Sequence, residues 1–128
     1  MEEALVALLR GTATVTALVP AGRINWRRHP QGQPLPGIVL HLISAAPRYA
    51  LAAVGDVRDV RVQATCLGAD YAAAKAVARA VSARLSGYQA GAFHQIRIVG
   101  ERDVEQAGVP VPGEPAVVML DFVFIYRG

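Results

Sequence analysis

The stretch Val57–Leu67, VRDVRVQATCL, decides the fold. Apolar side chains occupy every second position from residue 60 to residue 66, and polar or charged side chains occupy the positions between them. This alternation predicts a β-strand with one buried face, because successive side chains of a strand point to opposite sides of a sheet. The apolar set is Val60, Val62, Ala64 and Cys66, and the polar set is Asp59, Arg61, Gln63 and Thr65.

A long helix is predicted immediately after this strand. Asp70 is a good N-cap residue, and Gly87 is the residue type that commonly follows the last helical turn. Between them, apolar residues recur at the three- and four-residue spacing of one helical face. That stripe, over a helix ending at Leu85 or Ser86, is Tyr71, Ala74, Val77, Ala78, Val81 and Leu85.

Shorter elements flank the strand and helix on both sides. The N-terminal pattern predicts a helix over residues 2–9, ended by Gly11, and a helical turn over 13–18. Further strands are expected over residues 22–26, 38–44, 93–99 and 117–126. This order predicts one α+β domain spanning residues 1–128. Its sheet would be mostly antiparallel or mixed, with four to five strands, and the long helix and the short N-terminal helix would pack on one face.

The two C-terminal strands are also predicted from alternation. One face of the first is expected to carry Phe93, Gln95, Arg97 and Val99, and the other His94, Ile96 and Ile98. In the second strand, one face is expected to carry Val118, Leu120, Phe122, Phe124 and Tyr126.

Two proline-rich segments are predicted to be long loops, His29–Pro36 and the tract from Glu101 to Pro115. Loops of this length in a small domain tend to be functional. The second loop opens with three acids at a spacing of two, Glu101, Asp103 and Glu105. We favour a solvated arm for them, and cation binding is the alternative.

Composition excludes several classes of protein. The longest apolar run, Ala116–Leu120, is far shorter than the ~18–20 residues that a membrane-spanning helix needs. The acidic start, Met1-Glu2-Glu3, is unlike a secretory signal, so we expect folding in a cytoplasm.

The net charge of +3 is spread along the chain, which permits weak contact with DNA without favouring specific binding. The single Cys66 is expected to be a buried thiol.

No catalytic motif is present. The three histidines, His29, His41 and His94, show no metal-binding spacing, and a metal site could arise from them only through the fold. There is no phosphate-binding loop and no nucleophile elbow. We therefore expect no catalytic residue, no cofactor and no bound metal.

Two groups of residues are better candidates for contact with another protein chain. Trp26 lies among Arg23, Arg27 and Arg28, a composition typical of an interface anchor. A tryptophan that closes the edge of the core is an equally good interpretation. The polar face carrying Asp59, Arg61 and Gln63 faces either solvent or a second subunit.

The order of these pieces resembles the tail-terminator, or tail-completion, family of long-tailed phages, prophages and gene transfer agents. The resemblance covers nearly the whole chain, and its most specific part is residues 61–85. The segments that carry it are EEALVALLRG (2–11), ATVTALVPAGRI (13–24), PQGQPLPGIVLHLIS (30–44), RDVRVQATCLGADYAAAKAVARAVSARLSGY (58–88) and VVMLDFVFIYRG (117–128).

The resemblance implies a structural protein that is not an enzyme. It implies a ring, of six subunits in the best-known relatives, at the head–tail junction of a virion or phage-like particle assembled in the bacterial cytoplasm. The implied partners are other copies of the chain, the tail tube protein and a head-closure or neck protein, with DNA passing through the lumen without specific binding. The tentative interface residues then include Asp103 and Glu105 beside those named above. A small enzyme using His41, His94 and loop acids, or a ligand-binding α+β domain, remains the alternative.

Overall fold

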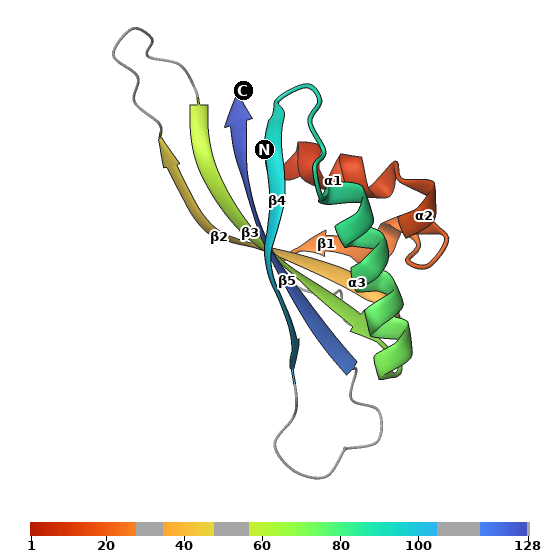
Figure 1. Ribbon diagram of the computed structural model, residues 1–128. Helices are drawn as coiled ribbons and strands as arrows, with labels where there is room; N and C mark the ends of the chain where they lie inside the picture. Colours follow the sequence, from red (N-terminus) through yellow and green to blue (C-terminus); the bar gives the residue numbers. More distant parts are fainter. Residues whose placement is uncertain (28–34, 48–56, 105–115, 128) are drawn as a thin grey trace, which may run out of the picture.

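The computed structural model describes residues 1–27, 35–47, 57–104 and 116–127. They form one five-stranded sheet with helices on one side (Figure 1). In chain order, the elements are α1 (Glu2–Arg10), α2 (Ala13–Thr16), a 3-10 turn (Ala21–Arg23), β1 (Ile24–Trp26), β2 (Gly37–Pro47), β3 (Val57–Gly68), α3 (Tyr71–Leu85), β4 (Phe93–Val104) and β5 (Ala116–Arg127). The predicted α+β class is confirmed.

The sheet has the strand order β1-β2-β3-β5-β4. Only β1 and β2 run parallel, with Ile24 opposite Ile38. The other three pairs are antiparallel. The long strand β5 lies between β3 and β4 although it is the last strand in the sequence, so the centre of the sheet combines segments about 50 to 70 residues apart.

The strand and helix that decide the fold form as predicted. Val60, Val62, Ala64 and Cys66 are at most 3 % exposed. The Asp70 carboxylate accepts a hydrogen bond of 2.7 Å from the Ala73 N–H, which caps the first turn of α3. Gly87 follows the helix with a positive φ of 76°, the left-handed conformation that favours glycine.

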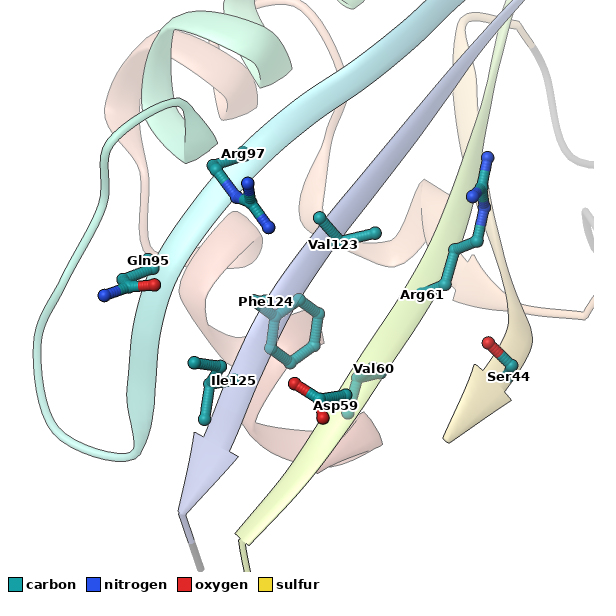
Figure 2. Close-up of a pocket in the computed structure, with 9 residues that line it drawn as sticks. All are labelled: Ser44, Asp59, Val60, Arg61, Gln95, Arg97, Val123, Phe124 and Ile125. Carbon is teal, nitrogen blue, oxygen red and sulfur yellow. The ribbon is translucent and has the colours of Figure 1, made fainter. Parts of the chain in front are cut away.

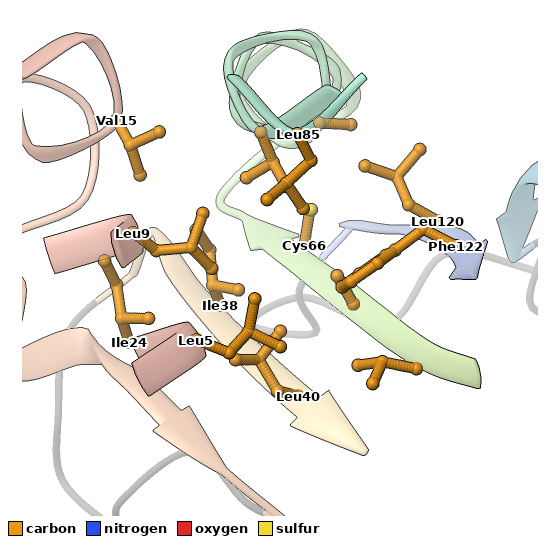
Figure 3. Close-up of a cluster of buried hydrophobic side chains, with 14 of the residues drawn as sticks. Leu5, Leu9, Val15, Ile24, Ile38, Leu40, Cys66, Leu85, Leu120 and Phe122 are labelled. Carbon is orange, nitrogen blue, oxygen red and sulfur yellow. The ribbon is translucent and has the colours of Figure 1, made fainter. Parts of the chain in front are cut away.

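The hydrophobic core lies between the sheet and the helices (Figure 3). Leu5 and Leu9 of α1, Val15 of α2 and Leu85 of α3 are fully buried. The strands contribute Ile24, Ile38, Leu40, Cys66, Leu120 and Phe122, also fully buried. The predicted helical stripe is correct except for Tyr71, which is 52 % exposed because it lies in the first turn of α3.

Gly68 allows α3 to lie against the end of β3. A Cβ atom at this position would meet the backbone N of Ala74 and approach the carbonyl carbon of Ala73 to 2.9 Å. Contacts this short with backbone atoms are not relieved by a side-chain movement, so the close packing of strand on helix requires glycine here.

Three predictions about the strands are corrected. Gly22 belongs to the 3-10 turn, and β1 begins at Ile24. The simple alternation over residues 93–99 is wrong, because the pairing of β4 with β5 shifts between His94 and Arg97 and again between Ile98 and Gly100. β4 also continues to Val104, so Glu101 and Asp103 lie in a strand and not in a loop.

Candidate interaction face

The sheet has one face that the helices do not cover. It carries the polar set of β3, the residues of β5 that pair with them, and Arg97 of β4. Figure 2 shows Asp59, Arg61 and Arg97 on this face. Because paired residues share a face of an antiparallel sheet, the strand register places Ser44, Arg61, Val123 and Arg97 in one row across four strands. We call this side the helix-free face.

Three polar side chains meet at the centre of this face. Gln63 lies opposite Asp121 on β5, and its amide donates a 3.3 Å hydrogen bond to the Asp121 carboxylate. The guanidinium of Arg61 is 3.8 Å from the other carboxylate oxygen of Asp121. Arg61 therefore already has a partner within its own subunit, but its side chain is 46 % exposed and remains available for contacts with another chain.

A shallow hollow opens on the same face beside this cluster. Its lining includes Asp59 and Arg61 from β3, Gln95 and Arg97 from β4, and Ile125 from β5 (Figure 2). Further along β3 the face becomes less accessible, since Thr65 is only 9 % exposed. The accessible part is thus the half that carries Asp59, Arg61 and Arg97, and charges of both signs alternate there.

Glu101 and Asp103 face the other way. They pair with Leu120 and Val118, whose side chains belong to the core side, so both carboxylates point toward α3. The Lys75 ammonium is 2.9 Å from Glu101 and 4.0 Å from Asp103. The Tyr71 hydroxyl donates a 3.0 Å hydrogen bond to Asp103. The hydrogen bond to Glu101 raises the pKa of Lys75 above its ordinary value.

The prediction of a loop arm is wrong for Glu101 and Asp103, which lie on β4, although their side chains remain 37 % and 44 % exposed. The cation beside them is the ammonium group of a lysine from the same chain. Among the residues that the structure describes, no three His, Cys, Asp or Glu side chains are grouped so that they could hold a metal ion.

The tryptophan and the basic residues beside it lie in a third place, next to α1. The Trp26 indole N–H donates a 2.9 Å hydrogen bond to the carbonyl of Glu2, and its ring packs on the edge of the core. Arg23 donates a 3.4 Å hydrogen bond to the carbonyl of Leu35. Arg27 follows β1 with a φ of 75° and donates its backbone N–H to Leu40.

The predicted interface residues therefore do not form one site. Arg23, Trp26 and Arg27 lie near α1, Asp59, Arg61 and Gln63 lie on the helix-free face, and Asp103 lies against α3. Arg28, Glu105, His29 and most of the two predicted loops are outside the described residues. Sequence reasoning missed Asp121 and Arg97 as members of the helix-free face, because strand register alone brings them beside Arg61.

Burial also decides the chemistry of the single thiol. Cys66 is fully buried beneath α3, and desolvation, with a smaller effect of the Glu101 charge, raises its pKa to about 12. A thiol with this pKa is almost entirely protonated at neutral pH and is a poor nucleophile.

In the described part of the chain, no helix has the length and apolar character to cross a membrane.

Comparison with known proteins agrees with the resemblance of the sequence to the tail-completion family. The chain is similar to a solved structure described as "Virion of native gene transfer agent (GTA) particle", with 26 % sequence identity and a TM-score of 0.67. The match covers 100 % of this chain and 95 % of the other. The comparison with curated proteins gives no match. The family model described as tail completion protein gp17 matches residues 3–126. The chain therefore belongs to the tail completion protein gp17 family.

Proposed function

We propose that this chain is a non-enzymatic subunit of a ring that ends the tail tube and joins it to the head. The observation that carries the proposal is the family match over residues 3–126, together with the likeness of the whole chain to a chain of a gene transfer agent virion. In this proposal the ring has six copies, and its neighbours are the tail tube protein on one side and a head-closure or neck protein on the other.

The one-sided architecture suits a ring subunit. Helices cover one side of the sheet, while part of the other side carries alternating charges around Asp59, Arg61 and Arg97. Such a pattern is suited to a neighbour with the reversed pattern and sets the relative position of two chains more than their affinity. Repeated side-to-side contacts between different surfaces of one chain close into a ring when the rotation between neighbours is right.

The charge of the chain is compatible with passage of DNA through the ring. A net charge of +3 per subunit is modest. A strongly basic lumen would bind phosphates by releasing counterions, and it would hinder movement of DNA. We therefore propose that DNA passes through the lumen without specific binding and that the ring sits at the head–tail junction of a particle assembled in the bacterial cytoplasm.

Two observations speak against the alternative of a small enzyme. His41 is on β2 and His94 is on β4, with β3 and β5 between them, so their backbones are roughly 14 Å apart across the sheet. The Cys66 thiol is buried with its pKa raised to about 12, which makes it a poor nucleophile. These groups do not converge on one substrate position.

The proposal is tested by counting copies and by deleting the gene. Quantitative mass spectrometry of intact particles should give about six copies per tail, and electron microscopy should place them in one ring at the head end. Particles made without the chain should have tails of uncontrolled length, not joined to heads. One or two copies per particle, or normal joined tails after deletion, would defeat the proposal.

A further inference from the structure

One edge of the sheet is open along half of a long strand. β1 pairs with β2 only from Ile38 to Leu40, and the Arg27 N–H donates to the Leu40 carbonyl where this pairing ends. Beyond Leu40, β2 continues for seven residues, and no strand in the described ranges pairs with their outer side. The segment His41–Pro47 therefore presents backbone donors and acceptors at an edge; we call it the open edge of β2.

The open edge of β2 lacks the charged side chains that usually protect an edge strand. Its sequence, HLISAAP, contains no Asp, Glu, Lys or Arg, and Leu42 and Ile43 are 44 % and 50 % exposed. Edge strands are normally shielded by charged side chains, above all lysine, because bare edges add further strands. The protection that is present is limited to the register shift between Leu42 and Ser44 and to Pro47, which cannot donate a backbone hydrogen bond. The composition is that of an edge that is covered in the assembled state.

A hollow of about 420 Å³ adjoins the open edge. It is lined by Glu2, Trp26, Arg27, His41 and Leu42. The Nδ1 atom of His41 is buried and has no hydrogen-bond partner among the described residues. An apolar side chain from a partner strand would fit between Trp26 and Leu42, and a polar group on that strand would satisfy His41.

A second edge, on the opposite side of the sheet, is also half open. The first half of β4 is covered, since Gly87 donates to the Ile96 carbonyl at 2.9 Å and Ile96 donates to the Tyr88 carbonyl at 3.4 Å. From Arg97 onward, the described residues place no strand beyond β4. This open half carries Val99, which is 48 % exposed, and charges of both signs.

Strand direction makes these two edges complementary. Three antiparallel pairings separate β2 from β4, so the two strands run in opposite directions. In a ring whose axis runs roughly along the strands, rotation preserves direction, and β4 of one copy meets β2 of the next in antiparallel orientation. The N–H and C=O groups that point outward from the two edges, those of every second residue, would then find partners.

The open parts of the two edges overlap without any shift along the strands. Within one subunit, His41 shares a row with Gly100 and Ser44 shares a row with Arg97, so residues 41–44 of β2 are level with residues 97–100 of β4. When neighbouring copies are related by rotation about an axis along the strands, these two segments face each other. Leu42 and Ile43 are then level with Val99 of the next copy.

From these observations we propose that the open edge of β2 pairs with the open half of β4 from the next copy of this chain, with Leu42 and Ile43 near Val99 of its neighbour. The inference rests on the proposed ring and names the surfaces that close it. In this pairing the charged open half of β4 meets the uncharged open edge of β2. The charges on β4 disfavour pairing of β4 with a second β4, and covering the open edge of β2 prevents its aggregation.

Cross-linking tests the pairing directly. In the full chain carrying both Ile43→Cys and Val99→Cys, a short bis-maleimide applied to assembled tails should give covalent oligomers up to the ring size on denaturing gels. Each single variant should give none. Cys66 does not interfere, because it is buried with its pKa raised to about 12. Microscopy of the same tails reports whether the ring itself has formed.

The outcomes separate the inference from the proposed function. Two outcomes would overturn the pairing but not the proposed ring. One is rings that form without cross-links in the double variant, and the other is cross-links from Ile43→Cys alone to a different particle protein. Particles without any ring would overturn both.

A lysine scan supplies an independent readout. Leu42→Lys and Ile43→Lys should keep the monomer folded by circular dichroism and reduce the number of rings per tail at least tenfold. Leu18→Lys is the matched control, because Leu18 is 40 % exposed, lies after α2 and should leave ring formation unchanged. Equal ring yields from all three variants would contradict the pairing.

Discussion

The two faces of β3 differ in how completely residues of the same chain bury them. On the face toward the helices, Val62, Ala64 and Cys66 are fully buried by residues of the same chain. On the helix-free face, Arg61 and Gln63 both interact with Asp121 of the neighbouring strand, and the Arg61 side chain remains 46 % exposed. Packing inside the subunit determines the first face completely. The second face is completed only partly by the subunit, so substitutions on the two faces should have separable effects on folding and on assembly.

The sharpest test of the covered face is Val77→Asp. Val77 is 2 % exposed on the stripe of α3 that packs on the sheet. An unpaired carboxylate there costs several kcal/mol, which is a large share of the stability of a small domain, so we expect the subunit to unfold. Circular dichroism and thermal melting measure this. Ala83→Asp, at an exposed position of the same helix, should remain folded; a stable Val77→Asp protein would contradict the assigned core.

The junction between β3 and α3 should be almost as sensitive. Gly68→Ala places a Cβ against the backbone of Ala73 and Ala74, so the helix must move away from the strand. We expect a loss of about 1–3 kcal/mol, the usual range for overpacked sites. Gly22→Ala is the control, because a Cβ there meets nothing within 4 Å. Urea unfolding of the two variants should give clearly different midpoints, and identical midpoints would refute the close approach.

Removing the helix cap should have a smaller effect on the same side of the sheet. Asp70→Ala loses the 2.7 Å hydrogen bond to the Ala73 N–H and should cost about 1 kcal/mol. Asp70→Asn retains an acceptor and should recover most of that loss. If Asp70→Asn is as unstable as Asp70→Ala in urea unfolding, the cap does not act through its hydrogen bond.

The helix-free face should show the smallest change in stability and a large change in assembly. Arg61→Glu puts a second carboxylate near Asp121, but this exposed pair is worth at most about 1 kcal/mol. We expect a nearly unchanged melting temperature together with impaired ring closure, measured by light scattering and by microscopy of assembled tails. Arg58→Glu, an exposed arginine of the same strand on its other side, is the matched control. Normal rings from Arg61→Glu would show that this face makes no contact with a neighbour through Arg61.

Local patterns were enough to predict much of the fold. The strict alternation of β3 and the pair of Asp70 and Gly87 around α3 depend only on neighbouring residues, and both predictions are confirmed. The prediction for residues 93–99 failed because two bulges shift the register of β4. Gln95 adopts a φ of 53°, and Phe93 and Ile96, three residues apart, are both buried. A bulge depends on the partner strand, which a period-two pattern does not contain.

The candidate site was predictable only in part for the same reason. Arg61 and Gln63 were correctly placed on one face, since a single strand determines that. Their contact with Asp121 bridges 58 or more positions in the sequence and requires the order of strands in the sheet. The acids at 101 and 103 were assigned to a loop because they open a tract rich in proline, glycine and charge. In the structure they lie on β4, where Lys75 and Tyr71 of α3 contact them.

The position of β5 has a consequence for synthesis of the protein. β3, β5 and β4 are adjacent in that order, so the strand between the other two is synthesised after both of them. Until residues 116–127 have emerged, β3 can pair only with β2, and β4 lacks the strand that joins it to the sheet. Such pairing between distant segments is slow compared with local helix formation. A nascent chain therefore cannot display a finished sheet with correctly spaced edges, and in the proposed ring a subunit would become competent to assemble only after translation of β5 is complete.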